Sequence, residues 1–226
     1  MIKVDKSPTL AGAATERALV LGYAPADARD GLAALLALDE RLGAILRTTR
    51  EPLVGQMRLT WWYEALEALD HAPAPAEPVL ATLSQKVVAQ VPGTMLARQI
   101  EGWEALLDTP LTIGALEAHA RARGGGLFAA AATLLATPPN DTIVRSGEGW
   151  VLADLARHLS DPALATAAHA AALERLSGAL DQRWPARVRA LGALAWLARL
   201  DLTHPTRPAG HPTRAARLLW HRLSGR

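Results

Sequence analysis

The stretch GQMRLTWWYEALEAL, residues 55–69, decides the fold class, because its apolar side chains recur at helical spacing. Side chains three and four residues apart share one face of a helix. On that spacing two apolar stripes follow the segment, with Met57, Trp61 and Ala65 on one and Leu59, Trp62, Leu66 and Leu69 on the other. The pattern predicts a helix that is apolar over a wide arc, with both tryptophans in the wall of a helical bundle.

The composition extends this prediction to the whole chain. The protein has 226 residues, of which 50% are hydrophobic, and this is enough for one sizeable core. Alanine and leucine dominate while valine and isoleucine are sparse, so helix formers fill nearly every window. We therefore expect an all-α fold and treat residues 1–226 as a single domain.

Charge and missing residue types narrow the function classes. Its 24 Lys and Arg against 22 Asp and Glu give a formal net charge of +2, too small to indicate nucleic-acid binding. The absence of cysteine excludes disulfides, thiolate metal sites and a cysteine nucleophile. The opening MIKVDKSPTL has no apolar signal core, and the apolar run 127–136 is far shorter than the roughly 18–20 residues of a spanning helix. These features predict a cytoplasmic protein without a transmembrane segment.

Proline and glycine punctuation divides the chain into helical segments. Asp27, Thr112 and Asp161 are expected N-caps, and Pro52 and Pro162 fit the first turns of their helices. The stretch HAPAPAEP, residues 71–78, is expected to be a stiff loop between helices. The predicted helices are 9–22, 27–48, 52–69, 79–91, 94–107, 113–136, 141–159, 162–181, one that starts at 185, and 212–223.

Three glycines, residues 124–126, interrupt the expected helix 113–136. Glycine has no side chain, so it either bends a helix or lets another backbone or a ligand approach closely, at a cost of about 1 kcal/mol per residue relative to alanine. The sequence leaves both interpretations open.

Acidic side chains three or four residues apart could hold Mg²⁺, which takes one or two carboxylates and fills its other positions with water and phosphate oxygens. Such spacing is also typical of the solvated stripe of an amphipathic helix. One of the acids concerned, Asp161, is already expected to serve as a helix N-cap, which accounts for its position without a metal ion. Three groups have this spacing: Glu64, Glu67 and Asp70; Glu101, Glu104 and Asp108; and Asp154, His158 and Asp161.

Four blocks of sequence, in this order and spacing, resemble the squalene/phytoene synthase family along essentially the whole chain. They are YAPADARDGLAALLALDERLGAILRTTREPLVGQMRLTWWYEALEAL (23–69), RARGGGLFAAAATLL (121–135), GEGWVLADLARHL (147–159) and HPTRAARLLWHRLSGR (211–226). The resemblance implies the all-helical isoprenoid synthase fold, a bundle around a deep apolar cavity. In active members two Asp-rich motifs face each other across that cavity and hold Mg²⁺ against two prenyl diphosphates, which are joined head to head.

The chain departs from the family pattern at both of these motifs. The aspartates of the first motif fall by position on Gly43, Ala44 and Arg47. In the second, Arg157 is kept, His158 stands in an Asp position, and Asp161-Pro162 closes the helix. We therefore predict no metal site and no cofactor, with Mg²⁺ needed only if activity survives.

Without Mg²⁺, a diphosphate in a low-dielectric cavity needs substitute cations, and a guanidinium pairs with phosphate in a bidentate fork. Arginines on helices also extend their charged ends to solvent, so the composition fits either state. The candidate cavity and diphosphate-binding residues are Arg47, Arg58, Trp62, Arg121, Gly125, Asp154, Arg157 and His158.

Two function hypotheses follow, and a third concerns location. The first is a non-catalytic family member that binds an isoprenoid lipid or a protein partner; GQMRLTWW is similar to a branch of respiratory complex I assembly factors with degenerate Asp motifs, which implies an assembly or scaffold role. The alternative is an active Mg²⁺-dependent prenyltransferase with Glu64, Glu101, Glu104 or Asp154 as replacement ligands. The third is peripheral contact with an anionic membrane through the basic segment that contains Arg207, Arg214, Arg217, Arg222 and Arg226.

Overall fold

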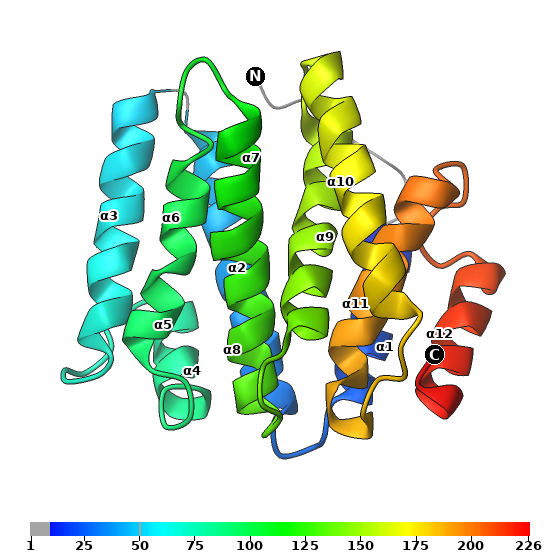
Figure 1. Ribbon diagram of the computed structural model, residues 1–226. Helices are drawn as coiled ribbons and strands as arrows, with labels where there is room; N and C mark the ends of the chain where they lie inside the picture. Colours follow the sequence, from blue (N-terminus) through cyan, green and yellow to red (C-terminus); the bar gives the residue numbers. More distant parts are fainter. Residues whose placement is uncertain (1–9, 50) are drawn as a thin grey trace.

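The computed structural model describes residues 10–49 and 51–226, and every regular element within them is helical (Figure 1). The predicted all-α fold is confirmed. The expected start of the first helix at Thr9 and the opening segment lie outside the described residues. The helices are α1 (Leu10–Tyr23), α2 (Arg29–Thr48), α3 (Pro52–Ala68), α4 (Pro78–Lys86), α5 (Gly93–Ala97), α6 (Gln99–Glu104), α7 (Ile113–His119), the π-helical η1 (Ala120–Gly125), α8 (Gly126–Leu134), α9 (Asp141–His158), α10 (Pro162–Leu180), the 3₁₀ turn η2 (Ala186–Val188), α11 (Arg189–Thr203) and α12 (Pro212–Ser224).

Two of the three predicted N-caps are confirmed. The Thr112 hydroxyl accepts the N–H of Ala115 at 3.1 Å, and the Asp161 carboxylate accepts the N–H of Ala163 at 2.8 Å. The cap at Asp27 is wrong, because α2 begins two residues later and Ala28, at its N-cap position, makes no side-chain cap bond. The expected helices 79–91 and 94–107 are shorter or divided, with α4 ending at Lys86 and α5 and α6 separated at Arg98.

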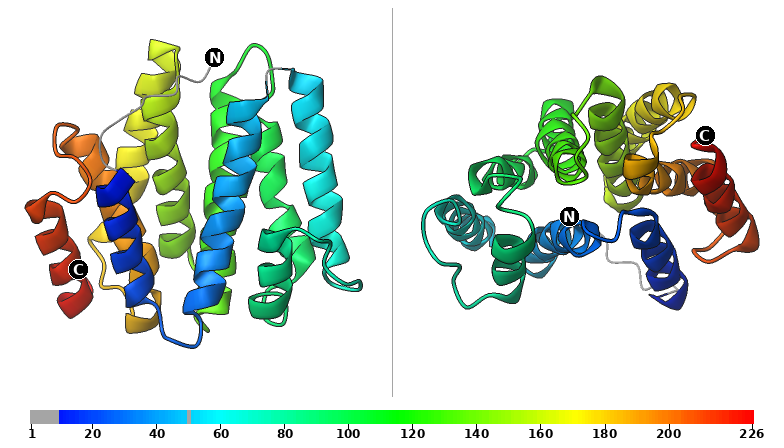
Figure 2. Two further views of the ribbon diagram at one scale, coloured as in Figure 1. Left: turned by 180° about the vertical axis from the view of Figure 1, so that it is seen from behind. Right: turned by 90° about the horizontal axis from the view of Figure 1, so that it is seen from below.

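Helix α3 buries one of its two apolar stripes and exposes most of the other. Leu59, Trp62, Leu66 and Leu69 belong to the core, whereas Trp61 is 46% exposed and Met57 is 65% exposed. The prediction that both tryptophans line the bundle is therefore wrong for Trp61. Neighbours cover only one side of α3, which stands at the edge of the molecule (Figures 1 and 2), and Trp61 meets Trp62 only edge to face.

The glycine triplet allows two backbones to touch. At Gly124 the chain forms the π-helical turn η1, and an added Cβ there would overlap the carbonyl group of Gly147 in α9. The reciprocal overlap holds for a Cβ on Gly147. Of the two interpretations left open by the sequence, the close approach of another backbone is the one observed, and it presses η1 against α9.

The core consists of two adjoining clusters of buried side chains. One contains side chains from α1 to α6, α8, the start of α9, η2, the start of α11 and α12, and the other contains side chains from α7, η1, α9, α10 and α11. The partly buried Trp150 and Trp196 contact both clusters. Helix α9 packs against α8, α10, α11 and η1, which places it in the middle of the bundle (Figure 2). In the described part of the chain no helix combines the length and the apolar character needed to cross a membrane.

We predict that Gly124→Ala lowers the free energy of unfolding by about 1 to 3 kcal/mol, because the new methyl group overlaps a rigid backbone. The matched control is Gly178→Ala in α10, where no atom lies within 4 Å of an added Cβ. That change should stabilise the protein by up to about 1 kcal/mol. Urea unfolding of the two variants measures both effects, and equal unfolding energies would contradict the close contact.

Candidate functional site

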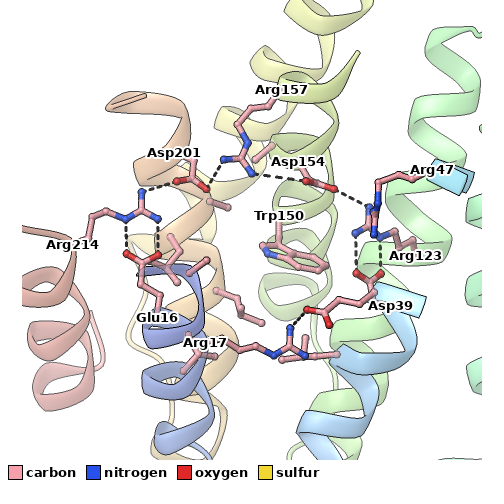
Figure 3. A pocket seen from close by; sticks show the side chains of 18 residues that line it. Glu16, Arg17, Asp39, Arg47, Arg123, Trp150, Asp154, Arg157, Asp201 and Arg214 are labelled. Carbon is pink, nitrogen blue, oxygen red and sulfur yellow. Dashed lines mark hydrogen bonds and ion pairs between the residues drawn. The ribbon is translucent and has the colours of Figure 1, made fainter. Parts of the chain in front are cut away.

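A cavity of ≈ 390 Å³ lies between α1, α2, α9 and α11 and is closed on two sides by η1 and α12 (Figure 3). Its apolar wall is formed by aliphatic side chains and one indole, and its polar side by five arginines and five carboxylates. The apolar lining residues are Ala13, Val20, Leu36, Trp150, Ala153, Leu194, Leu197 and Ala198, and the charged ones are Glu16, Arg17, Asp39, Glu40, Arg47, Arg123, Asp154, Arg157, Asp201 and Arg214.

Arg123 joins the two helices that face each other across this cavity. Its side chain is only 6% exposed, and its Nε and Nη2 donate to the Asp39 carboxylate of α2 at 2.6 and 2.9 Å. Nη1 donates to Oδ2 of Asp154 in α9 at 3.3 Å. The guanidinium also lies 4.1 Å from the ring centroid of Trp103, so every side of the cation is occupied.

The ion pairs continue from Asp154 along the cavity (Figure 3). Arg157 lies 3.9 Å from Asp154 and 3.3 Å from Asp201 of α11. Arg214 of α12 donates to Asp201 at 2.6 Å and binds Glu16 of α1 in a bidentate pair at 2.7 and 2.9 Å. Acidic and basic groups therefore alternate without a break from α2 to α1, through α9, α11 and α12.

The surroundings of Asp154 keep its carboxylate charged. Burial alone would raise the pKa of this group, but the hydrogen bond from His158 and the charges of Arg123 and Arg157 hold the pKa well below its usual range. His158 responds in the opposite sense, because its bond to Asp154 raises the imidazole pKa. Asp154 is thus an anion that interacts with two arginines and with the imidazole of His158.

His119 contacts Arg123 on the side away from the cavity, and its imidazole is neutral. Burial, reinforced by the charge of Arg123, lowers the pKa of His119 to about 3. A neutral ring lets Nδ1–H donate to the Gly102 carbonyl at 2.5 Å while Nε2 faces Nη1 of Arg123 at 3.3 Å. The ring is fully buried, so it orients the guanidinium and does not face the cavity.

The predicted site residues do not converge on one site. Arg47, Asp154 and Arg157 line the cavity, and His158 adjoins it through Asp154. Arg58 and Trp62 line a separate groove between α2 and α3, together with Arg41 and Trp61. Arg121 lies in a third depression, beside Arg98 and Glu101. Gly125 packs against α9, where an added Cβ would lie 3.1 Å from Val144.

Sequence reasoning missed seven charged residues of the cavity: Glu16, Arg17, Asp39, Glu40, Arg123, Asp201 and Arg214. For one of them, Asp39, the sequence pattern does indicate a buried position. Asp39 falls on the buried stripe of α2 that contains Leu32, Leu35 and Leu42, and a lone acid on an apolar stripe indicates a buried partner. The others lie far along the chain from the groups they bind.

The residues present do not fit the Mg²⁺ site that the family resemblance implies. The space beside Gly43 is filled, because an added Cβ would lie 2.9 Å from Arg47 and 3.0 Å from Trp103. The cavity carboxylates of α2 and α9 are already paired, Asp39 and Asp154 with Arg123 and Glu40 with Arg17. Across residues 10–49 and 51–226, no three His, Cys, Asp or Glu side chains gather closely enough to hold a metal ion.

The proposed replacement ligands lie outside the cavity, apart from Asp154. Glu64 is exposed on α3, while Glu101 and Glu104 line a shallow groove beside Leu53. Asp70, from the first acidic group, accepts the N–H groups of Gly93 and Thr94 at 2.5 and 3.1 Å and so caps α5.

We predict that Arg123→Met lowers the free energy of unfolding by about 3 to 5 kcal/mol, since it leaves Asp39 buried without a partner. The exposed pair Arg145–Glu174 supplies the control, and Arg145→Met should cost less than about 1 kcal/mol. The double variant Asp39→Leu/Arg123→Met should recover much of the loss, because it removes both charges. Equal costs for the two single variants in urea unfolding would refute the role of Arg123.

Comparison with protein families gives one match, to the model described as squalene/phytoene synthase, over residues 10–163. Comparison with curated proteins and with solved structures gives no match. The matched region runs from α1 to the start of α10 and contains Asp39, Arg123 and Asp154. It covers well over half of the 226 residues. The chain belongs to the squalene/phytoene synthase family.

Proposed function

We propose that the protein is a non-catalytic member of this family whose cavity binds an isoprenoid-type apolar molecule without a metal ion. The observation that carries the proposal is the Arg123 bridge, in which a guanidinium stands between the inward-facing carboxylates of α2 and α9. The positions of the family's two metal motifs fall on these same two helices, and here an arginine of the chain joins carboxylates of both.

Charge balance decides which ligands fit the cavity. Five arginines face five carboxylates, and four of these arginines are ion-paired, leaving Arg47 without an ion pair in the described part of the chain. A diphosphate carries several negative charges, so binding it would require breaking existing pairs, and each carboxylate left alone in a partly buried site would be costly. A neutral or singly charged head group beside Arg47 disturbs none of the ion pairs.

The apolar wall fits the remainder of such a ligand. Val20, Leu36, Leu194 and Leu197, from α1, α2 and α11, face Trp150 of α9 across the cavity. Burying an aliphatic chain against these side chains is favourable at about 25 cal/mol per Å² of apolar surface removed from water. The apolar wall therefore supports an isoprenoid-type ligand, and the charge balance of the polar side supports a head group other than a diphosphate.

A second candidate function, a scaffold for a protein partner, is favoured by a different observation. Leu53, Met57 and Trp61 form an exposed apolar face on α3, with exposed fractions of 69%, 65% and 46%. A helix that is apolar on both sides is usually covered on both. This role is compatible with an occupied cavity, because the face lies outside it.

The test is titration calorimetry with farnesol and with a non-hydrolysable farnesyl diphosphate analogue, each with and without Mg²⁺. We expect farnesol to bind in both conditions and the diphosphate analogue to gain nothing from Mg²⁺. Ala13→Trp should abolish farnesol binding, because Ala13 lines the cavity at its exposed rim. The control Trp61→Ser, which lies outside the cavity, should leave binding unchanged.

The opposite outcome supports the prenyltransferase alternative. Mg²⁺-dependent binding of the analogue, together with pyrophosphate release from farnesyl diphosphate that Asp154→Asn abolishes, would overturn the non-catalytic proposal. Absence of farnesol binding in every condition would overturn the isoprenoid part and leave the scaffold role of α3.

A further inference from the structure

Helix α12 presents a second apolar stripe that its packing in the bundle does not use. Ala216, Leu219, Trp220 and Leu223 follow the spacing i, i+3, i+4 and i+7, which places them on one side of the helix. Leu219, Trp220 and Leu223 are 55%, 56% and 69% exposed. Large side chains in this pattern normally lie against another surface.

The opposite side of α12 already accounts for its attachment to the bundle. Arg214 is buried in its pair with Glu16, Leu218 is fully buried, and His221 lies under α11 with its ring near Trp184. The helix forms one edge of the molecule, farthest from α3 (Figures 1 and 2). The outward stripe is therefore not needed to hold α12 in place.

The charge around this stripe is strongly positive. Residues 182–226 contain nine arginines and one acid, Asp201, although the whole chain has a net charge of only +2. Asp201 is already bound by Arg214 and Arg157 in the cavity. Two of the nine arginines, Arg187 and Arg214, also pair with Asp27 and Glu16 from outside this region, and the remaining arginines leave it with a surplus of positive charge.

Several of these arginines gather where α12 ends. Arg222 and Arg226 are exposed on or just after the helix, and Arg183 and Arg189 lie beside Gly225. These four arginines make no ion pair with any residue that the structure describes. Arg222 contacts the Gly22 carbonyl and the Tyr23 ring instead, which leaves its charge uncompensated.

The exposed apolar face of α3 differs in its surroundings. Beside Leu53, the neighbouring groove contains the acids Glu101, Glu104 and Asp108. Negative charge at that position repels an anionic surface. At the other end of this face, the groove beside Trp61 contains Arg41 and Arg58. The surroundings of the α3 face are therefore mixed in charge, whereas no acid follows Asp201 in the part of the chain that contains α12, and only that helix has a uniformly basic setting that complements anionic lipids.

We propose that the outer face of α12 binds the surface of an anionic lipid bilayer. Trp220, Leu219 and Leu223 enter the headgroup region, where an indole ring is favoured, and the arginines at the helix end contact lipid phosphates. The helix lies flat on the bilayer in this arrangement. The proposal is independent of what the cavity binds.

The experiment is flotation of the full chain with vesicles of phosphatidylcholine alone and of equal parts phosphatidylcholine and phosphatidylglycerol. We expect binding to the anionic vesicles only, weakened by added salt. The triple variant Leu219→Gln/Trp220→Gln/Leu223→Gln should lower the partition coefficient by about tenfold or more, since it removes the inserted apolar groups. Arg222→Gln/Arg226→Gln should lower it by a similar factor at low salt.

A matched control is the triple variant Leu53→Gln/Met57→Gln/Trp61→Gln on α3, which should float as the unmodified protein does. All of the substituted side chains are well exposed, and thermal unfolding checks that each variant is folded. Equal flotation with both kinds of vesicle, or equal loss in the α3 variant, would overturn the proposal. Light scattering provides a further test. If the protein is a dimer that the α12 triple variant dissociates, and vesicle binding is unchanged in that variant, the proposal is overturned and this face binds a second copy of the chain.

Discussion

The burial of the Arg123 guanidinium is the constraint on which the rest of the structure depends. A buried cation is tolerated only when anions and hydrogen-bond acceptors surround it, so Asp39 of α2 and Asp154 of α9 must stay where they are. The π-helical turn and the contact of Gly124 with Gly147 bring η1 close enough to α9 for this bridge. Neutral His119 and the Trp103 ring then fix the orientation of the guanidinium.

The same bridge supports our proposal that the cavity works without a metal ion. Inward-facing carboxylates repel one another unless a cation lies between them, and an arginine supplied by the chain is a permanent one. Such a cation cannot leave with a product, and the donors of Arg123 are already bound to Asp39 and Asp154. The cavity keeps its apolar wall, and the function we propose is therefore binding. The exposed faces of α3 and α12 lie outside the cavity and add surfaces for partners of different kinds.

Local patterns in the sequence were sufficient for the helical class, the caps at Thr112 and Asp161, the buried stripe of Trp62 and the family. They were insufficient for Trp61, because a helix that is apolar all round does not reveal which side its neighbours cover. The ion pairs that line the cavity could also not be predicted from local sequence patterns. Arg123 binds Asp39 across 84 residues and Arg214 binds Glu16 across 198, and no short-range spacing encodes such pairs. The single domain and the cytoplasmic location stay predictions.

The most direct test of the account is electron paramagnetic resonance of Mn²⁺, a spectroscopic substitute for Mg²⁺, titrated into the protein with and without the farnesyl diphosphate analogue. If Arg123 occupies the gap between Asp39 and Asp154, the signal of free Mn²⁺ should remain undiminished by the protein in both titrations. Loss of the free signal on addition of the protein, reversed by Asp154→Asn, would show that a divalent ion displaces the guanidinium and would contradict the account.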